Sequence, residues 1–378
     1  MGLIAYSVKQ EDEDKTLRIS ATEFFATQKK IKSRYLPAEW ENQSAIQLTW
    51  PHQGTDWTYM LEEVTACYIN LAREISCRQP LLIVTPEPEK VQELLGDMQN
   101  VYLFKCATND TWARDHGFIT LRTEKEAQLL DFQFNGWGMK FAANLDNQIC
   151  RRMAETGILT GTYKSCLDFV LEGGSIESDG CGTLLTTSEC LLSPNRNDTL
   201  SQDMIESRLM NEFNLKQVLW LDHGYLAGDD TDSHIDTLAR LCPMDTIVYV
   251  QCLNPNDEHY DELQKMEAQL KTFRTLEGNP YRLLPLPMAD PVIVDGERLP
   301  ATYANFLIMN KAVLYPTYNQ PENDAQAAAV LQEAFPTREI VGINCEALIK
   351  QHGSLHCVTM QFPEEVFNTI LNKVYEKD

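Results

Sequence analysis

Four short segments concentrate the residues that could do chemistry. They are 109–117 (NDTWARDHG), 171–177 (LEGGSIE), 228–236 (GDDTDSHID) and 352–357 (HGSLHC). Each follows or begins an apolar run of the kind that forms a strand. Because α/β proteins place catalytic groups at strand ends and in the loops after them, we expect the four segments to meet in one site.

The third of these segments holds four Asp and one His within nine residues. If it is locally extended, His234 and Asp236 point the same way, since side chains alternate along a strand. An imidazole and a carboxylate on one face could serve one pocket. The simpler alternative is a surface acidic loop that binds calcium, but D-D-T-D lacks the spacing of an EF-hand and its closing Glu.

Each of the other segments, taken alone, has an ordinary structural explanation. Asp115 could pair with Arg114 on the surface, and Glu172 could face solvent before a bulge formed by two glycines. A lone Cys such as Cys357 is more often buried packing than a nucleophile. Together, however, the segments supply a Cys, a His, a carboxylate that could orient the His, and two further Asp.

This set of side chains favours chemistry on a guanidine. A thiolate with a His partner is a pair for covalent catalysis. Two spare carboxylates suit a planar, delocalised cation with several N–H donors, and Trp112 could stack on its flat face. Peptide hydrolysis fits less well, because it needs an oxyanion hole and no pair of acids.

Composition narrows the class of protein and its partners. The chain has 378 residues, 43% of them hydrophobic, and a formal net charge of −23 from 55 acidic and 32 basic side chains. We expect no nucleic-acid or membrane partner, and a negative field could attract a small cationic substrate, although acidity also serves solubility. The sequence has no run of about 18 apolar residues, so no membrane span is predicted.

The cysteines indicate a cytoplasmic location. There are eleven, scattered singly and without a C-x-x-C pair. Neither a zinc knuckle nor a thioredoxin motif is therefore predicted, and unpaired thiols fit a reducing compartment.

Strands and helices alternate along the chain, which predicts an α/β fold. Residues 1–34 are expected to be a polar lead-in and 35–378 one catalytic domain. Predicted strands cover 45–50, 80–86, 101–107, 118–122, 128–134, 182–187, 218–222, 246–252, 281–287, 305–310, 312–318 and 339–343. Predicted helices cover 57–77, 89–98, 145–156, 202–213, 258–273, 324–335 and 363–377. Strands and a helix recur every 60–80 residues or so, which is compatible with propeller-like repetition.

Long ordered motifs run through nearly the whole chain from Leu36 onward. They are NDTWARDHG, LEGGSIESDGCGTLLTTSECLLSPNRN, GDDTDSHIDTLARL, and YANFLIMN followed by LHCVTMQ. On these motifs the chain resembles the agmatine deiminase and bacterial peptidylarginine deiminase family. The resemblance implies a single-domain, pentein-like five-bladed α/β propeller with its site at the central axis, no metal and no organic cofactor. A homodimer is compatible with it.

The resemblance also implies a role for each site residue. It places Cys357 as nucleophile, His234 as general acid and base, Glu172 as the orienter of His234, Asp115 and Asp236 as guanidinium ligands, and Trp112 and Asp230 in the substrate pocket. The implied reaction converts agmatine and water to N-carbamoylputrescine and ammonia through a covalent Cys amidino intermediate. Deimination of peptidylarginine and amidino transfer to an amine stay open on the same fold. Two alternatives with a different function are a non-catalytic guanidine-binding protein and a cysteine protease.

Three departures from the family pattern bear on substrate choice. Residues 351–355 (QHGSL) replace a run of glycines, Ser233 stands where Gly is usual, and Phe118 where Pro is common. They affect the loop expected over the substrate's tail. The Asp cluster beside His234 favours a cationic tail, whereas Arg114 could reach a carboxylate if it is not held elsewhere.

Overall fold

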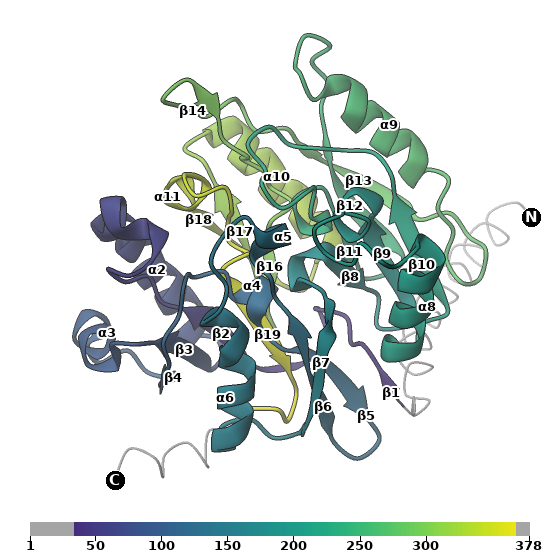
Figure 1. Ribbon diagram of the computed structural model, residues 1–378. Coiled ribbons are helices and arrows are strands. Elements are labelled where there is room, and N and C mark those ends of the chain that lie inside the picture. Colours follow the sequence, from purple (N-terminus) through teal and green to yellow (C-terminus); the bar gives the residue numbers. More distant parts are fainter. Residues whose placement is uncertain (1–33, 368–378) are drawn as a thin grey trace, which may run out of the picture.

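The computed structural model describes residues 34–367, and within them five sheets repeat one plan (Figure 1). In each sheet an inner strand pairs antiparallel with a middle strand, and a helical crossover leads to a parallel outer strand. The protein therefore has an α/β fold built from five similar modules, as the sequence predicts.

The first module joins the two ends of the described chain, because its inner strand comes from the C-terminal side. Its elements are β19 (Thr359–Pro363), β2 (Gln43–Thr49), η1 (Asp56–Met60), α2 (Leu61–Ser76), β3 (Leu81–Thr85), α3 (Pro88–Leu95) and β4 (Val101–Lys105). In Figure 1 the yellow strand β19 lies beside the purple-blue strand β2. This pairing closes the ring of modules.

The second and third modules follow in chain order. The second comprises α4 (Ala113–His116), β5 (Ile119–Thr123), β6 (Ala127–Gln133), α5 (Gly136–Met139), η2 (Asp146–Gln148), α6 (Ile149–Thr156) and β7 (Thr162–Val170), with β1 (Arg34–Tyr35) at its edge. The third comprises η3 (Gly173–Ser175), β8 (Ile176–Ser178), β9 (Thr183–Thr187), α7 (Ser188–Leu191), α8 (Gln202–Phe213) and β10 (Gln217–Leu221).

The fourth and fifth modules complete the ring. The fourth comprises η4 (Ile235–Thr237), β11 (Ala239–Cys242), β12 (Thr246–Gln251), α9 (Tyr260–Leu270) and β13 (Arg282–Pro287). The fifth comprises β16 (Leu307–Ile308), β17 (Ala312–Thr317), α10 (Pro321–Ala334), β18 (Glu339–Asn344) and α11 (Glu346–Ile349). Between them a small hairpin is formed by β14 (Ile293–Val294) and β15 (Glu297–Arg298).

Local sequence explains why these elements form. The middle strands are largely buried, since helices cover one face and the molecular centre the other; β9 is buried along its whole length. In α2 the buried residues Val64, Tyr68, Leu71 and Ile75 recur at helical spacing. Pro88 and Pro321 occupy first-turn positions, where a missing N–H costs nothing.

The connections that enter the inner strands meet at the centre of the molecule. Asp115, Glu172, Asp236, Asn305 and Cys357 each lie a few residues before an inner strand, one in each module. The short helices η3, η4 and α4 contact one another or the neighbouring inner strands. Each module therefore delivers one polar side chain to a common centre.

The sequence misses seven strands of the described residues; three of them, β1, β14 and β15, have only two residues each, and the other four are longer. In β7 the burial pattern is irregular, β8 has three residues, and β11 contains Arg240, a charged residue that reads as a surface position. The fourth, β19, precedes residues predicted as helix from 363; the described residues 363–367 form the end of the strand and a turn, and the rest of that prediction lies outside the described residues. No helix among residues 34–367 is long and apolar enough to cross a membrane.

Candidate active site

A pocket with about 370 Å³ of space, part of it open to solvent, lies at the centre where the five modules meet. Its lining consists of Asp56, Asp110, Trp112, Asp115, Trp137, Phe141, Asp230, Thr231, Gln351, His352, Gly353 and Cys357. Four of the seven predicted site residues are in this set. The other three, His234, Glu172 and Asp236, are fully buried in the same centre, as the contacts below show.

Cys357 is 4% exposed and lies at the inner end of this pocket. Its Sγ is 3.2 Å from Asn305 Nδ2 and 3.9 Å from Asp236 Oδ2. Burial raises the pKa of the Cys357 thiol well above its ordinary value, and the carboxylates of Asp236 and Asp115 raise it further. A cation placed between these carboxylates would oppose that effect and favour the thiolate.

His234 lies between two carboxylates without a hydrogen bond to either. Its Nδ1 is 3.7 Å from Asp115 Oδ1, its Nε2 is 3.9 Å from Glu172 Oε2, and neither nitrogen has a hydrogen-bond partner. Burial lowers the pKa of His234, but Asp115, Cys190 and Glu172 outweigh it and hold the pKa well above the ordinary range. The protonated form of the ring is therefore favoured, and neither nitrogen donates to Asp115 or Glu172.

Arg196 holds Glu172 from behind. Its Nε donates to both Glu172 oxygens, at 3.0 and 2.9 Å, and its Nη2 donates to the carbonyl of Thr231 at 2.9 Å. Both side chains of the pair are fully buried. Sequence reasoning missed Arg196 although it lies in the quoted motif, because a buried Arg and a surface Arg look alike in a single sequence.

Asp115 is fixed by two donors at the head of the pocket. Its Oδ1 accepts from the backbone N–H of Gly174 at 2.9 Å, and its Oδ2 accepts from Trp137 Nε1 at 3.0 Å. A Cβ on Gly174 would lie 2.6 Å from His234 Nδ1 and 2.9 Å from Asp115 Oδ1. The second glycine of the LEGGS motif is therefore required by the close approach of the predicted site residues His234 and Asp115.

Asp236 meets His234 by a different route from the predicted one. Residues 235–237 form the 3-10 turn η4, so strand alternation does not bring the two side chains together. The turn does so: both approach Gly174, whose Cβ would lie 3.1 Å from Asp236 Oδ2. That oxygen also accepts from His356 Nδ1 at 2.7 Å, while Oδ1 is buried and has no partner.

The comparisons with known proteins agree with this geometry. The model of the Porphyromonas-type peptidyl-arginine deiminase family matches residues 35–363. The chain belongs to this family. The protein is therefore a guanidino-group hydrolase of the agmatine deiminase and peptidyl-arginine deiminase group.

Solved structures and curated relatives extend the likeness over nearly the whole chain. A "Putative Arginine Deiminase" of Porphyromonas gingivalis is 52% identical, with a TM-score of 0.85, over 89% of this chain and 100% of that one. An agmatine deiminase of C. jejuni with substrate bound is 39% identical, with a TM-score of 0.83, over 88% of this chain and 97% of that one. A "Putative agmatine deiminase" of Marinomonas sp. (strain MWYL1) is 30% identical over 353 residues, 87% of this chain and 94% of the relative.

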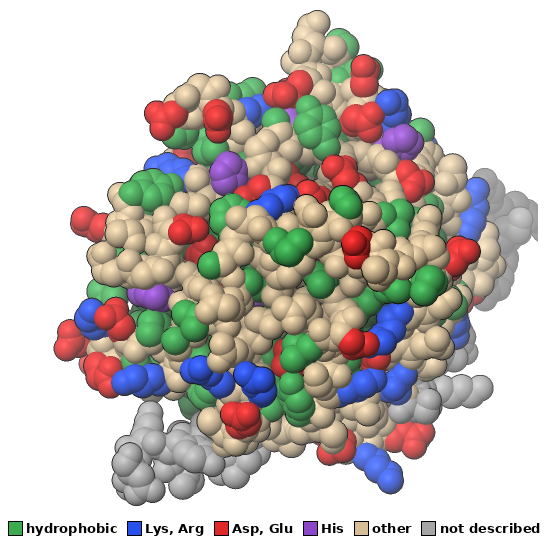
Figure 2. Space-filling model, viewed as in Figure 1, with side chains coloured by type: hydrophobic (Ala, Val, Ile, Leu, Met, Phe, Trp, Pro, Cys, Tyr) green, Lys and Arg blue, Asp and Glu red, His purple; other side chains and the backbone are tan. Residues whose placement is uncertain are grey.

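The outer part of the deiminase pocket is acidic. Asp56, Asp110 and Asp230 line it, and burial raises the pKa of Asp110 to about 7 and that of Asp230 to about 6. Acidic side chains are also spread over the face seen in Figure 2, in keeping with the net charge of −23. No Lys or Arg is among the lining residues of this pocket. Asp56 lies outside the motifs, and Asp110 lies within 109–117 but is not among the predicted site residues.

Arg114 is not available to the substrate. Its side chain is 3% exposed, and its Nη1 donates to Gln361 Oε1 at 2.7 Å, while the pocket lining includes Asp115 but not Arg114. The question that the sequence left open, whether Arg114 reaches a substrate carboxylate, is answered by this contact.

The loop that departs from the family's glycine run crosses the mouth of the pocket. Gln351 Nε2 donates to the carbonyl of Asp56 at 3.0 Å, and His352, at φ 66°, places Nδ1 2.7 Å from the carbonyl oxygen of Gly228. A Cβ on Gly353 would lie 2.1 Å from the ring of Trp112. The loop is therefore tied down on both sides, and the glycine that it keeps is the one that passes over Trp112.

The other two departures have local explanations. Ser233 has φ 59°, a left-handed conformation that glycine adopts at lower cost. It is held there because its N–H donates to Asp229 Oδ2 at 2.8 Å and its hydroxyl donates to Glu189 Oε2 at 3.0 Å. Phe118 is fully buried in an apolar cluster and does not line the catalytic pocket.

Among residues 34–367, two buried groups have the side chains that could hold a metal. They are Glu172, Cys190 and His234, and Glu39, Glu177 and His356. Their members come from distant segments, so sequence spacing could not reveal them. In each group a guanidinium already supplies positive charge: Arg196 donates to Glu172, and Arg240 donates to Glu39 and Glu177. Both groups are therefore ion-paired clusters.

Proposed function

We propose that the protein is an agmatine deiminase that converts agmatine and water to N-carbamoylputrescine and ammonia. The observation that carries the proposal is the lining of the catalytic pocket. Four Asp side chains, Asp56, Asp110, Asp115 and Asp230, meet there with Cys357 and with no Lys or Arg. Agmatine has a guanidinium at one end and an ammonium at the other, so this pocket complements both of its charges.

The guanidinium end binds between Asp115 and Asp236. Asp236 Oδ1 is buried without a partner, so a guanidinium N–H would satisfy it, and Asp115 supplies the second acceptor. Trp112 and Trp137, edge to face at 6.4 Å, give the flat cation aromatic walls. Neutralising the two carboxylates lowers the pKa of Cys357, so the substrate itself helps to form the nucleophile.

In the first half of the reaction Cys357 displaces ammonia. The thiolate attacks the guanidinium carbon and forms a C–S bond. His234, protonated because its pKa is raised, gives its proton to a leaving nitrogen, and the C–N bond breaks. A covalent amidino thioether remains on Cys357, and His234 is left neutral.

In the second half water regenerates the enzyme. Neutral His234 takes a proton from water, which attacks the amidino carbon, and the C–S bond breaks to release the ureido product and the Cys357 thiolate. Glu172, fixed by Arg196, keeps the imidazole in place during both proton transfers.

The ammonium tail lies toward Asp56, Asp110 and Asp230. Free arginine would bring a carboxylate into the same acidic region, where Arg114 is turned toward Gln361 and Arg196 is paired with Glu172. Peptidylarginine has neither tail charge, so it neither gains from the three carboxylates nor is repelled by them. The expected order of efficiency is therefore agmatine, then peptidylarginine, then free arginine.

Substrate profiling tests this assignment. We expect kcat/KM for agmatine to exceed that for free arginine by at least about a hundredfold, or about 2.7 kcal/mol, a size typical of one or two charged contacts. Asp230→Asn should weaken agmatine more than butylguanidine, which has no ammonium. Equal or better turnover of arginine or an arginyl peptide would overturn the agmatine assignment, and an amidino product formed with an added amine would indicate transfer instead.

A further inference from the structure

Asn305 contacts the sulfur of Cys357, although it is not among the lining residues of the catalytic pocket. It belongs to the YANFLIMN motif, lies two residues before strand β16, and is fully buried. Cys357 lies two residues before β19, the inner strand of another module. Two modules therefore bring a neutral amide against the predicted nucleophile, and the reaction proposed above gives that amide no role.

Four contacts fix which way the amide of Asn305 faces. Its Oδ1 accepts from the backbone N–H groups of His356 and Cys357, at 2.8 and 3.3 Å. Its Nδ2 lies 3.4 Å from the carbonyl oxygen of Asp236 and 3.2 Å from Cys357 Sγ. A reversed amide would place donor against donor at His356 and acceptor against acceptor at Asp236. Nδ2 is therefore the atom that offers an N–H to the sulfur.

The amide discriminates between the two protonation states of the sulfur. Sγ lies 3.3 Å from Oδ1 as well as 3.2 Å from Nδ2. The S–H of a thiol is a weak donor, and Oδ1 already accepts two backbone N–H groups. A thiolate, in contrast, accepts a charge-assisted hydrogen bond from Nδ2, about twice as strong as a neutral one. The Asn305 amide therefore favours the thiolate over the thiol.

Other neighbours of Cys357 oppose a thiolate. Burial and the carboxylates of Asp236 and Asp115 raise the pKa of the thiol, whereas the backbone of Ser354 and the side chain of Asn305 lower it. An Asp in place of Asn305 would have nearly the same shape but would add a further carboxylate beside the sulfur. The amide N–H, rather than the volume of the side chain, is therefore the feature that assists the nucleophile.

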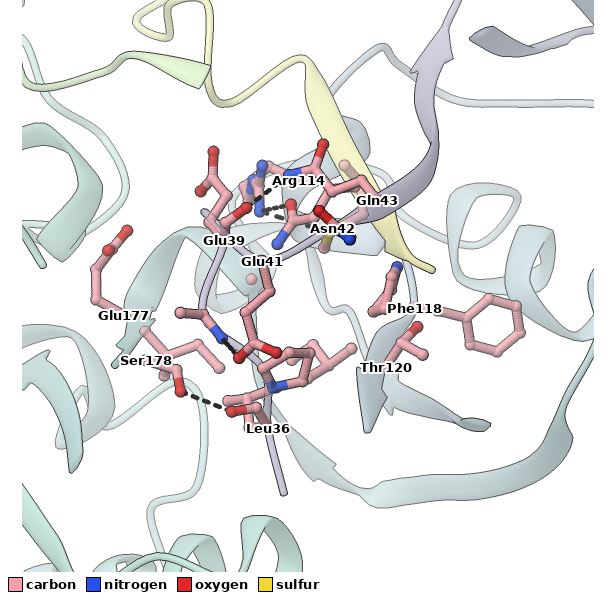
Figure 3. A pocket seen from close by; sticks show the side chains of 18 residues that line it. Leu36, Glu39, Glu41, Asn42, Gln43, Arg114, Phe118, Thr120, Glu177 and Ser178 are labelled. Atoms are coloured by element: carbon pink, nitrogen blue, oxygen red, sulfur yellow. Dashed lines mark hydrogen bonds between the residues drawn. The ribbon is translucent and has the colours of Figure 1, made fainter. Parts of the chain in front are cut away.

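The guanidinium of Arg114 does not take this place beside the sulfur. Its Nη1 donates to Gln361 Oε1 at 2.7 Å. In Figure 3 the Arg114 side chain lies with Glu39 and Gln43 on the wall of a second cavity, which shares no lining residue with the catalytic pocket. A neutral donor, the Asn305 amide, contacts Cys357 instead.

We propose that Asn305 is a catalytic residue that donates from Nδ2 to the thiolate of Cys357. When the C–S bond forms in the first half of the reaction, the sulfur loses its negative charge and this hydrogen bond weakens. When the C–S bond breaks in the second half, its electron pair stays on Sγ, and Nδ2–H again donates to the charged sulfur. This role rests on the proposed function, since it needs Cys357 as nucleophile, but it is the same for any guanidine substrate.

Alkylation of Cys357 by iodoacetamide in the full-length, substrate-free protein tests this role. Mass analysis follows the peptide that contains Cys357, because the chain has eleven cysteines. A hydrogen bond to a charged group corresponds to about 10–100-fold, so Asn305→Ala should slow this alkylation at about pH 8, and lower kcat, by that factor. KM should stay within about threefold, since Asn305 does not line the pocket.

An isosteric variant and a matched control separate the donor from the shape. Asn305→Asp keeps an acceptor for the backbone N–H groups but loses the donor, so alkylation of Cys357 should be slower still. Asn310→Asp is the control, because that amide also bridges backbone groups, the N–H and carbonyl of Gln43 at 2.9 Å each, and should change neither rate. In Asn305→Ala the N–H of His356 keeps its 3.1 Å bond to the backbone carbonyl of residue 305, which holds the segment in place.

Thermal unfolding shows which variants are folded, and Asn305→Asp carries the test if Asn305→Ala does not fold. Alkylation of Cys357 and kcat at the wild-type level in a folded Asn305 variant would overturn the catalytic role. So would a loss of stability or a higher KM with normal alkylation, which a purely structural role predicts. Failure of the proposed function gives a different result, because Cys357→Ser would then release ammonia whatever the Asn305 variants do.

Discussion

His234 and His356 are both buried, and each lies between two carboxylates, yet they are held in opposite ways. His356 is bonded at both ring nitrogens, to Asp236 Oδ2 at 2.7 Å and to Glu39 Oε2 at 2.8 Å. His234 is 3.7 Å from Asp115 and 3.9 Å from Glu172, and neither of its nitrogens has a partner. One ring is committed to its neighbours, and the other is free to exchange protons.

The difference assigns a structural part to His356 and a chemical part to His234, although both lie in one charged centre. His356 bonds to both Asp236 and Glu39, and Glu39 in turn pairs with Arg240. His356 therefore connects Asp236, which lies beside Cys357, to this ion pair. His234 makes no hydrogen bond to Asp115 or Glu172, so its ring can take up and release a proton without breaking one. We therefore expect replacement of His234 to lower mainly activity and replacement of His356 to lower mainly stability.

Replacing the uncommitted ring should give the largest loss of activity. In His234→Asn we expect kcat to fall about 10²–10⁴-fold or more, because one side chain serves both proton transfers. Ammonia release from agmatine measures kcat, and thermal unfolding measures stability. Activity within tenfold of wild type would remove His234 from the mechanism.

Moving that ring should cost less than removing it. Gly174→Ala places a methyl group 2.6 Å from His234 Nδ1, and displacing a catalytic group by about 1 Å can cost about a hundredfold in kcat. Gly54→Ala is the control, since its new methyl meets only the side chain of His52 on an exposed turn. If both variants turn over agmatine alike, the close packing around His234 is not needed for catalysis.

Replacing the committed ring should act mainly on stability. His356→Asn removes the imidazole that bonds Asp236 Oδ2 and Glu39 Oε2, although Glu39 keeps its bond to Arg240. Removing one partner of a buried charged contact typically costs about 3–5 kcal/mol of unfolding free energy. Urea unfolding measures this, and His223→Asn, which loses only an exposed contact with Glu262 at 3.5 Å, should change stability by less than about 0.5 kcal/mol. A larger loss of stability in His234→Asn than in His356→Asn would reverse the comparison.

The acidic tail region should make agmatine binding depend on pH. Burial raises the pKa of Asp230 to about 6 and that of Asp110 to about 7, so both carboxyls are protonated at pH 5 and ionised at pH 8. KM for agmatine should therefore fall, by about tenfold, as pH rises through this range. Butylguanidine is the control, because its turnover depends on the same catalytic groups but it has no ammonium tail. A KM ratio of the two substrates that does not change with pH would contradict the tail assignment.

The smallest effect is expected from chelators. Arg196 and Arg240 supply the positive charge in the two clusters of ligand-type side chains, so EDTA should leave kcat unchanged. Turnover that is lost in EDTA and restored by an added metal would show that one cluster holds an ion in solution.

Much of this site was predictable from the sequence because its motifs are long and polar residues in them are too dense for ordinary loops. The side chains named in this way, Cys357, His234, Glu172, Asp115 and Asp236, do converge at one centre. Their roles remain predictions. The strands with clear apolar runs, such as β3 and β12, were also predicted.

What the sequence missed is set by contacts between distant segments. Asp56, at the start of η1, and Asp110, just before α4, line the same pocket as His352 although the three are far apart in the sequence. Likewise Arg196 and Arg240 read as surface cations, whereas both are buried among carboxylates from other modules. The local sequence pattern does not indicate which modules will face one another in the fold.

The account depends most on covalent chemistry at Cys357, and acid-quenched turnover followed by peptide mass analysis tests it directly. During turnover of agmatine the peptide that contains Cys357 should gain the mass of agmatine less ammonia, and the adduct should disappear once substrate is spent. Cys357→Ser should form no such adduct and release no more than trace ammonia. Steady turnover with no adduct on Cys357, together with ammonia release by Cys357→Ser, would contradict the central claim.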